Sequence, residues 1–217
     1  MSENAVTGWD VLDTAHRALR SAARGIASDD RDRPTPCAQW TVTQVLQHAA
    51  GDQLAWAAAI TGGPGPTEDP FTPSGQLAGT PLAVVDQALS TAAGAWATVS
   101  EDAGDLPSPL PQGPLPASLA AAACAVDAAI HAWDIAVATG QPSPLSPALA
   151  KPLHAAATQI VEPLRGFAYA SPLDPQPGDD DIAALLRYLG RQPDRTGRQP
   201  ASAGGHDFEE GFGGRRG

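Results

Sequence analysis

Three side chains of one segment stand at the spacing of a helix face. Asp127, His131 and Asp134 occupy positions i, i+4 and i+7, so an α-helix places them on a single stripe. Burying two carboxylates and an imidazole on one stripe is costly unless they pair or bind something. One histidine from another helix would complete a set of two imidazoles and one carboxylate. That set suits a catalytic zinc or a ferrous ion and leaves coordination positions open for water or substrate.

The second imidazole is expected from His48, in a segment that opens another predicted helix. We therefore predict His48, Asp127 and His131 as the metal ligands. Asp134 is the candidate catalytic residue, which would orient a ligand histidine or a substrate group and so tune the site. Each residue also has a plainer interpretation: the histidines as core residues bonded to backbone carbonyls, and Asp134 as a surface acid near a helix end.

Neighbouring residues leave further alternatives open. Cys124 shares the stripe of Asp127 and is either a fourth ligand or, the favoured interpretation, a small buried thiol. Asp52, one helical turn after His48, either supports that histidine or is solvated. Cys37 is expected to pack rather than react. The remaining histidines are interpreted as structural or solvent-exposed: His16, His154 and His206.

Charge and motif content narrow the classes of function. The net charge of −11 argues against nucleic acid as a partner. No lysine or arginine stands between Pro34 and Ala150, so an anionic substrate would be held by the metal or by flanking arginines. The plain alternative is a surface that is merely rich in acid. The chain has no phosphate-cradling glycine loop, no nucleophile elbow, no Cys-x-x-Cys and no His-Glu-x-x-His.

A cytoplasmic location is predicted from the cysteines and the apolar runs. The two cysteines provide neither a disulfide framework nor zinc-finger spacing, so reduced thiols are expected. The first residues are acidic and lack an apolar segment, so no signal peptide is expected. No uninterrupted apolar run reaches membrane-spanning length, because residues 115–139 include the Asp127, His131 and Asp134 stripe. We therefore expect no membrane partner.

Composition and periodicity predict one all-α domain. Alanine dominates the apolar residues and aromatics make up only 5 %, which favours packed helices over a sheet. Apolar periodicity, a Thr41–Gln44 capping box and terminal glycines at 62 and 140 define the helices. We predict helices over about 8–27, 41–61, 81–96 and 117–139, then two shorter ones over about 146–166 and 180–190. Long connections rich in proline and glycine join them, as in bundles that build metal sites from inward side chains.

Three segments resemble one known family. Residues 35–42 followed by Leu46-Gln47-His48 are similar to the start of the second helix in the DinB-like superfamily. More specifically, they resemble the actinobacterial branch named for the N-terminal domain of mycothiol-dependent maleylpyruvate isomerase. Residues 127–141 resemble the ligand helix of that branch, and residues 182–193 its closing helix. The order and separation of the three segments make the resemblance fairly specific.

The resemblance implies a four-helix bundle with long crossover connections, extra short C-terminal helices and a divalent metal, usually zinc. By the same resemblance His48 on the second helix and Asp127 with His131 on the fourth are the ligands, although the branch usually has glutamate in place of Asp127. It implies an enzyme that transfers or isomerises a small organic substrate with a low-molecular-weight thiol such as mycothiol. The alternatives are a bundle that binds metal or a small molecule without turnover, and a specialised-metabolism enzyme that uses the cavity without a thiol.

The predicted organisation is a metal-binding bundle over residues 1–191 and a disordered tail over 192–217. The tail is rich in Gly, Arg, Pro and acid and shows no periodicity, which is typical of disorder. The oligomeric state is not predicted by these patterns.

Overall fold

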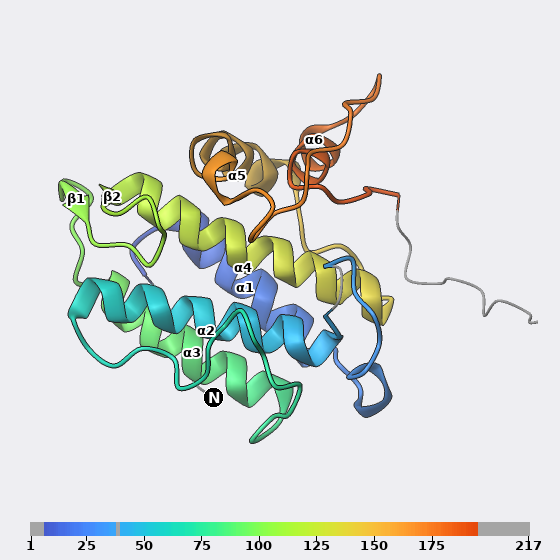
Figure 1. The fold of residues 1–217 in the computed structure, drawn as a ribbon, viewed down its shortest axis with the longest axis horizontal. Helices are drawn as coiled ribbons and strands as arrows, with labels where there is room; N and C mark the ends of the chain where they lie inside the picture. Colours follow the sequence, from blue (N-terminus) through green and yellow to red (C-terminus); the bar gives the residue numbers. More distant parts are fainter. Residues whose placement is uncertain (1–6, 38–39, 195–217) are drawn as a thin grey trace, which may run out of the picture.

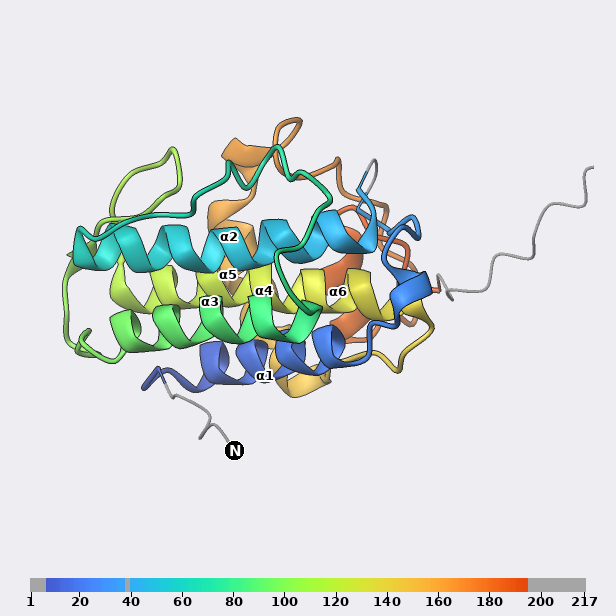
Figure 2. The same cartoon turned by 90° about the horizontal axis from the view of Figure 1, so that it is seen from below.

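The structure is a computed structural model that describes residues 7–37 and 40–194. Four long helices form a bundle: α1 (Asp10–Arg24), α2 (Val42–Thr61), α3 (Pro81–Trp96) and α4 (Ala117–Thr139). Their axes run roughly alongside one another in Figures 1 and 2. The predicted all-α class is confirmed, and each of the four helices lies within a few residues of its predicted range. The predicted tail lies from residue 195 on outside the described residues.

Local capping chemistry sets the ends of the site-bearing helices. The Thr41 backbone N–H donates to Gln44 Oε1 at 3.0 Å, and the Gln44 backbone N–H donates to Thr41 Oγ1, which forms the predicted capping box. Gly62 and Gly140 follow α2 and α4 with φ of +69° and +71°. A side chain at either position would be strained in that left-handed conformation, so glycine ends both helices.

The central element of the bundle is α4. It packs against α1, α2 and α5 (Pro147–Ile160), so most of its residues are buried, and apart from one polar stripe its buried surface is apolar. Its many alanines let the neighbouring helices approach closely. By length and composition α4 resembles a membrane-spanning helix, yet 83 % of its most apolar window is buried inside the protein. The buried polar residues on this helix therefore need an explanation.

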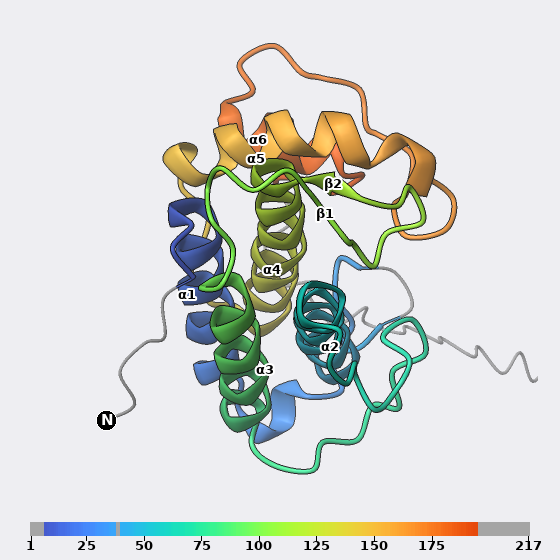
Figure 3. The same cartoon turned by 90° about the vertical axis from the view of Figure 1, so that its left-hand side faces the viewer.

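Two short helices cross the bundle on the side of α4 opposite to α2 and α3. Figure 3 shows α5 and α6 (Asp181–Tyr188) lying over the end-on bundle helices. The helix predicted over about 146–166 is shorter in the structure, because Pro163 cannot continue it: α5 ends at Ile160, and a 3₁₀ turn follows at Glu162–Leu164. The loop after this turn, together with the 62–80 crossover, lies over the middle of the bundle.

The connection between α3 and α4 contains the only strands in the described part of the chain. β1 (Asp105–Leu106) pairs antiparallel with β2 (Leu115–Pro116), in the register Asp105 to Pro116 and Leu106 to Leu115. The sequence patterns predicted only a proline-rich connection here. Because each strand is only two residues long, the sequence shows no alternating apolar pattern from which it could be predicted.

Candidate metal centre

The structure brings together the three residues predicted as ligands. One nitrogen of His48, one nitrogen of His131 and one carboxylate oxygen of Asp127 all lie within 4.8 Å of one another. Asp127 Oδ1 lies 3.4 Å from His48 Nε2 and 3.3 Å from His131 Nε2. The helical period of α4 aligns Asp127 with His131, and the packing of α2 on α4 supplies His48.

Hydrogen bonds fix how both imidazoles face this point. His48 Nδ1 lies 2.8 Å from the Pro70 carbonyl oxygen, and His131 Nδ1 lies 3.0 Å from Asp134 Oδ2. Because both partners only accept, each Nδ1 carries the proton and donates it. Both Nε2 atoms are therefore turned toward Asp127, and they are the imidazole atoms that can bind a metal.

The electrostatics of the centre call for a positive charge between these groups. Burial alone would lower the pKa of His131, but the Asp127 charge and the bonds to Asp127 and Asp134 raise it to about 10. Burial likewise would raise the pKa of Asp127, but the charge of His131 and bonds from both imidazoles hold it well below its usual range. Asp127 Oδ2 is buried and has no hydrogen-bond partner. Either a proton or a metal ion satisfies such a set.

Asp134 lies behind His131 and is itself held by Arg191. Arg191 Nη2 donates to Asp134 Oδ2 at 2.9 Å, and Arg191 Nε donates to Oδ1 at 3.3 Å. Burial would raise the pKa of Asp134, but the charge of Arg191 and the bonds from His131 and Arg191 lower it. The carboxylate is therefore ionised and fixes the tautomer of His131, which is the orienting geometry expected of it.

Sequence reasoning did not single out Arg191. It follows α6 and lies far from α4 in the chain, so no helical spacing links it to Asp134. The only signal was its place in the segment that resembles the closing helix of the family. Arg191 Nη1 also donates to the Leu189 carbonyl at 2.9 Å, which anchors the guanidinium to the end of α6.

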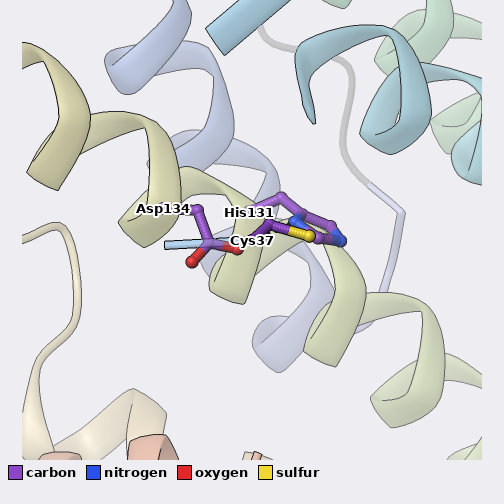
Figure 4. Close-up of side chains that lie close together, drawn as sticks. All are labelled: Cys37, His131 and Asp134. Atoms are coloured by element: carbon purple, nitrogen blue, oxygen red, sulfur yellow. Dashed lines mark hydrogen bonds and ion pairs between the residues drawn. The ribbon is translucent and has the colours of Figure 1, made fainter. Parts of the chain in front are cut away.

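A second group of potential ligands shares His131. Figure 4 shows the Cys37 side chain beside His131 and Asp134 of α4, and the ligand atoms of the three residues lie within 4.8 Å of one another. Cys37 was expected only to pack, so its place beside the centre is new information from the tertiary structure. Burial raises the pKa of the Cys37 thiol, which disfavours the thiolate. Because Asp134 is already bound by Arg191, the set of His48, Asp127 and His131 is the better candidate for a metal site.

The open alternatives for two neighbours resolve differently. Cys124 Sγ donates to Gln53 Oε1 at 3.1 Å, in a buried network that includes His16, so the structure supports the buried thiol over a fourth ligand. Asp52 neither contacts His48 Nδ1, whose partner is the Pro70 carbonyl, nor is solvated at Oδ2, which is buried without a partner. His154, by contrast, lies against the Tyr188 ring.

A cavity of about 430 Å³ adjoins the centre. Its walls come from α2, α4 and the loops before α3, before α4 and after α5. Its apolar lining includes Trp56, Phe71, Leu110, Leu164, Phe167 and Tyr169. Its polar lining consists of His48, Asp52, Asp69, Asp127, His131 and Arg191. The predicted ligands thus face a space large enough for a small organic molecule.

The comparisons with known proteins identify the family. Residues 12–136 match the mycothiol maleylpyruvate isomerase N-terminal domain, and the chain belongs to that family. It is also similar to two proteins of Mycobacterium tuberculosis, from strains CDC 1551 / Oshkosh and ATCC 25618 / H37Rv, both named as uncharacterized. Each is 32 % identical over 183 residues, which cover 79 % of this chain and 92 % of the relative. No solved structure matches the chain significantly.

Proposed function

We propose that this protein binds a divalent metal, with zinc as the preferred ion, through His48, Asp127 and His131. With that metal it acts on a small organic substrate together with a low-molecular-weight thiol of the mycothiol type. The observation that carries the proposal is the convergence of two imidazole Nε2 atoms on one buried carboxylate oxygen, at 3.3 and 3.4 Å. Two imidazoles and a carboxylate are a common catalytic zinc set that leaves a position open.

The donor set fits a metal on its own chemistry. Both Nδ1 atoms already donate hydrogen bonds, so Nε2 of each ring is the atom left to bind a metal, which would displace the proton that His131 holds there. Asp127 Oδ2, buried and unpartnered, gives the carboxylate a further acceptor atom for a cation. When bound, a divalent ion would stabilise the thiolate form of a thiol near neutral pH.

The residues of this chain position the donor set. The Pro70 carbonyl holds the His48 ring, and Asp134, itself gripped by Arg191, holds the His131 ring. We assign Asp134 as a positioning residue, in keeping with the sequence-based role of orienting a ligand. The family usually has glutamate where Asp127 stands, but the shorter side chain still reaches both imidazoles, which favours an aspartate that remains a ligand.

The proposal keeps the predicted setting of the protein. We propose a cytoplasmic location, small-molecule partners, and neither nucleic acid nor membrane as a partner. The organisation proposed is a metal-binding bundle over 1–191 followed by a tail. The alternative of a bundle that binds metal or a small molecule differs from the proposal in having no turnover.

The test begins with protein purified without chelator. Elemental analysis should find about one zinc per chain, and Asp127→Ala should lose it, with Asp102→Ala as an exposed control. Cobalt-loaded protein titrated with mycothiol should then gain a thiolate-to-metal charge-transfer band that metal-free protein lacks. Metal without the thiol band would refute the thiol step and leave the two alternatives that use no thiol, and parent protein free of metal after zinc dialysis would refute the metal site.

A further inference from the structure

The mouth of the cavity is built from exposed aromatic rings. Phe71 and Phe167 are the large apolar side chains exposed in the described part of the chain, at 43 % and 70 %. Their ring centroids lie 4.9 Å apart, although they come from the loops before α3 and after α5. Phe71 also lies 5.3 Å from the His48 ring. Exposed apolar surface gathered at a cavity mouth, rather than scattered, is typical of a ligand path.

The charges on the cavity wall disfavour an anion. Among the described residues, Arg191 is the one lysine or arginine that lines the cavity, and Asp134 already pairs with its guanidinium. The carboxyl groups of Asp69 and Asp127 line the same space, as does that of Asp52, whose pKa is raised well above its usual range by burial and by the Asp127 charge. A divalent ion at the ligand set would be balanced by Asp127 and one bound thiolate. No positive charge is left over for a carboxylate or phosphate on the second reactant.

Two carboxylate oxygens of the cavity lining are buried without a partner: Asp127 Oδ2, which belongs to the proposed metal site, and Asp52 Oδ2, which does not. Asp52 lies on α2, one helical turn beyond His48, and its Oδ2 is buried without a hydrogen bond. Asp69, by comparison, accepts from the Phe71 backbone N–H at 2.9 Å. A buried acceptor without a partner is costly, so a ligand that donates to Asp52 would gain from satisfying it.

We propose that the cavity takes an uncharged, ring-bearing molecule whose hydroxyl group donates a hydrogen bond to Asp52. The inference rests on the proposed function, in which the molecule bound in the cavity would be the second reactant beside the thiol. The aromatic side chains at the mouth and in the walls favour a molecule with a ring. Without an unpaired cation in the lining, an acid is disfavoured, and the Asp52 acceptor favours a hydroxyl group. Substrates that are dicarboxylates do not suit this chain.

Three probes of one ring system test the proposal in metal-free protein by fluorescence titration. They are 2-naphthol, which has the hydroxyl, 2-methoxynaphthalene, which cannot donate, and 2-naphthoate, which is an anion. We expect 2-naphthol to bind roughly tenfold tighter than either of the others, the effect of one hydrogen bond to a buried acceptor. Equal or tighter binding of 2-naphthoate would overturn the proposal, as would failure of all three to bind.

Variants separate the anchor from the cavity. Asp52→Leu, which keeps the side-chain shape without polar atoms, should bring 2-naphthol down to the affinity of 2-methoxynaphthalene and leave the latter unchanged or tighter. Phe167→Ser should weaken all three probes alike, and Asp102→Ala should change none. An unaltered preference for 2-naphthol in Asp52→Leu would show that Asp52 is not the anchor. A melting temperature at or above that of the parent would exclude misfolding of this variant, since it loses an unpaired buried carboxyl.

Zinc titrations of the same samples keep the two proposals apart. If the protein binds no zinc but selects 2-naphthol through Asp52, the ligand inference stands and the metal-dependent function fails. If it binds zinc but discriminates none of the probes, the metal site stands and the ligand inference fails.

Discussion

Arg191 grips the carboxylate of Asp134 with two hydrogen bonds, of 2.9 and 3.3 Å, from a position 57 residues further along the chain. Both side chains are buried, at 7 % and 0 % exposure. The pair ties the segment after α6 to the back of His131, because Asp134 Oδ2 also accepts from His131 Nδ1. The end of the described chain thereby helps to orient a candidate ligand on the central helix.

Breaking this pair should destabilise the fold. Arg191→Met leaves a buried carboxylate unpaired, so the free energy of unfolding should fall by about 3 kcal/mol. Urea denaturation followed by circular dichroism measures it. The double variant Asp134→Asn with Arg191→Met should recover part of the loss, because no unpaired carboxylate remains. Strictly additive effects of the two substitutions would contradict a direct pairing.

Removing the charge of Asp134 should weaken metal binding without removing a ligand. Asp134→Asn keeps the shape but no longer enforces the Nδ1–H tautomer of His131, so zinc affinity should fall by roughly 10–100-fold. Competition with a chelating dye measures the affinity. Cys37→Ser is the matched control, because it alters the other neighbour of His131 and should leave zinc affinity within about twofold of the parent if Cys37 is no ligand.

Substitutions of Asp127 should distinguish a drifted metal site from a repurposed one. Asp127→Ala removes one ligand of three, so zinc affinity should fall by about tenfold or more. Asp127→Glu restores the residue usual in the family and should hold or raise the affinity. Metal titration of both variants checks this. Parent-like affinity in Asp127→Ala would remove Asp127 from the ligand set, and weaker binding in Asp127→Glu would mean a cavity shaped around aspartate.

Zinc binding should release a proton and strengthen as the pH rises. With a pKa of about 10, His131 in the metal-free centre is protonated at neutral pH. Zinc must displace that proton, so affinity should rise about tenfold per pH unit between pH 6.5 and 8 and level off as the pH passes the His131 pKa. Calorimetry in two buffers of different ionisation enthalpy counts the released protons. A pH-independent affinity over this range would mean that His131 is neutral before the metal arrives.

His16 should make the fold sensitive to acid. Burial lowers its pKa from 6.5 to about 4, against smaller raising effects of the Gln53 hydrogen bond and of Asp13. Between these two values the unfolded chain binds a proton that the folded chain refuses. The stability contribution is therefore fully present above pH 6.5 and is lost as the pH falls toward 4, by about 3 kcal/mol in all.

Urea denaturation at pH 7 and pH 5 measures this loss. His16→Gln, whose amide can donate to Gln53 Oε1 as the imidazole does but does not titrate, should show a smaller loss between the two pH values than the parent. Equal losses in the two proteins would assign the acid sensitivity to other groups.

The sequence by itself determined the helices and the stripe on α4. Capping at Thr41, termination at Gly62 and Gly140, and the alignment of Asp127 with His131 all depend on interactions within one or two helical turns. Such local relationships repeat with the helical period and are visible in the order of residues. The fold class is confirmed for the same reason, whereas the ligand roles remain predictions.

Only the tertiary structure decided what surrounds that stripe. Arg191, Cys37 and the Pro70 carbonyl reach the centre from loops, whose backbone has no period that could link them to α4. The packing of α2 against α4 likewise sets which side chains face one another, and it leaves Asp52 Oδ2 buried and without a hydrogen-bond partner in the cavity. These contacts join residues that are far apart in the sequence. Burial and charge pairing at the site therefore depend on which segments pack together in space, and the order of residues does not reveal them.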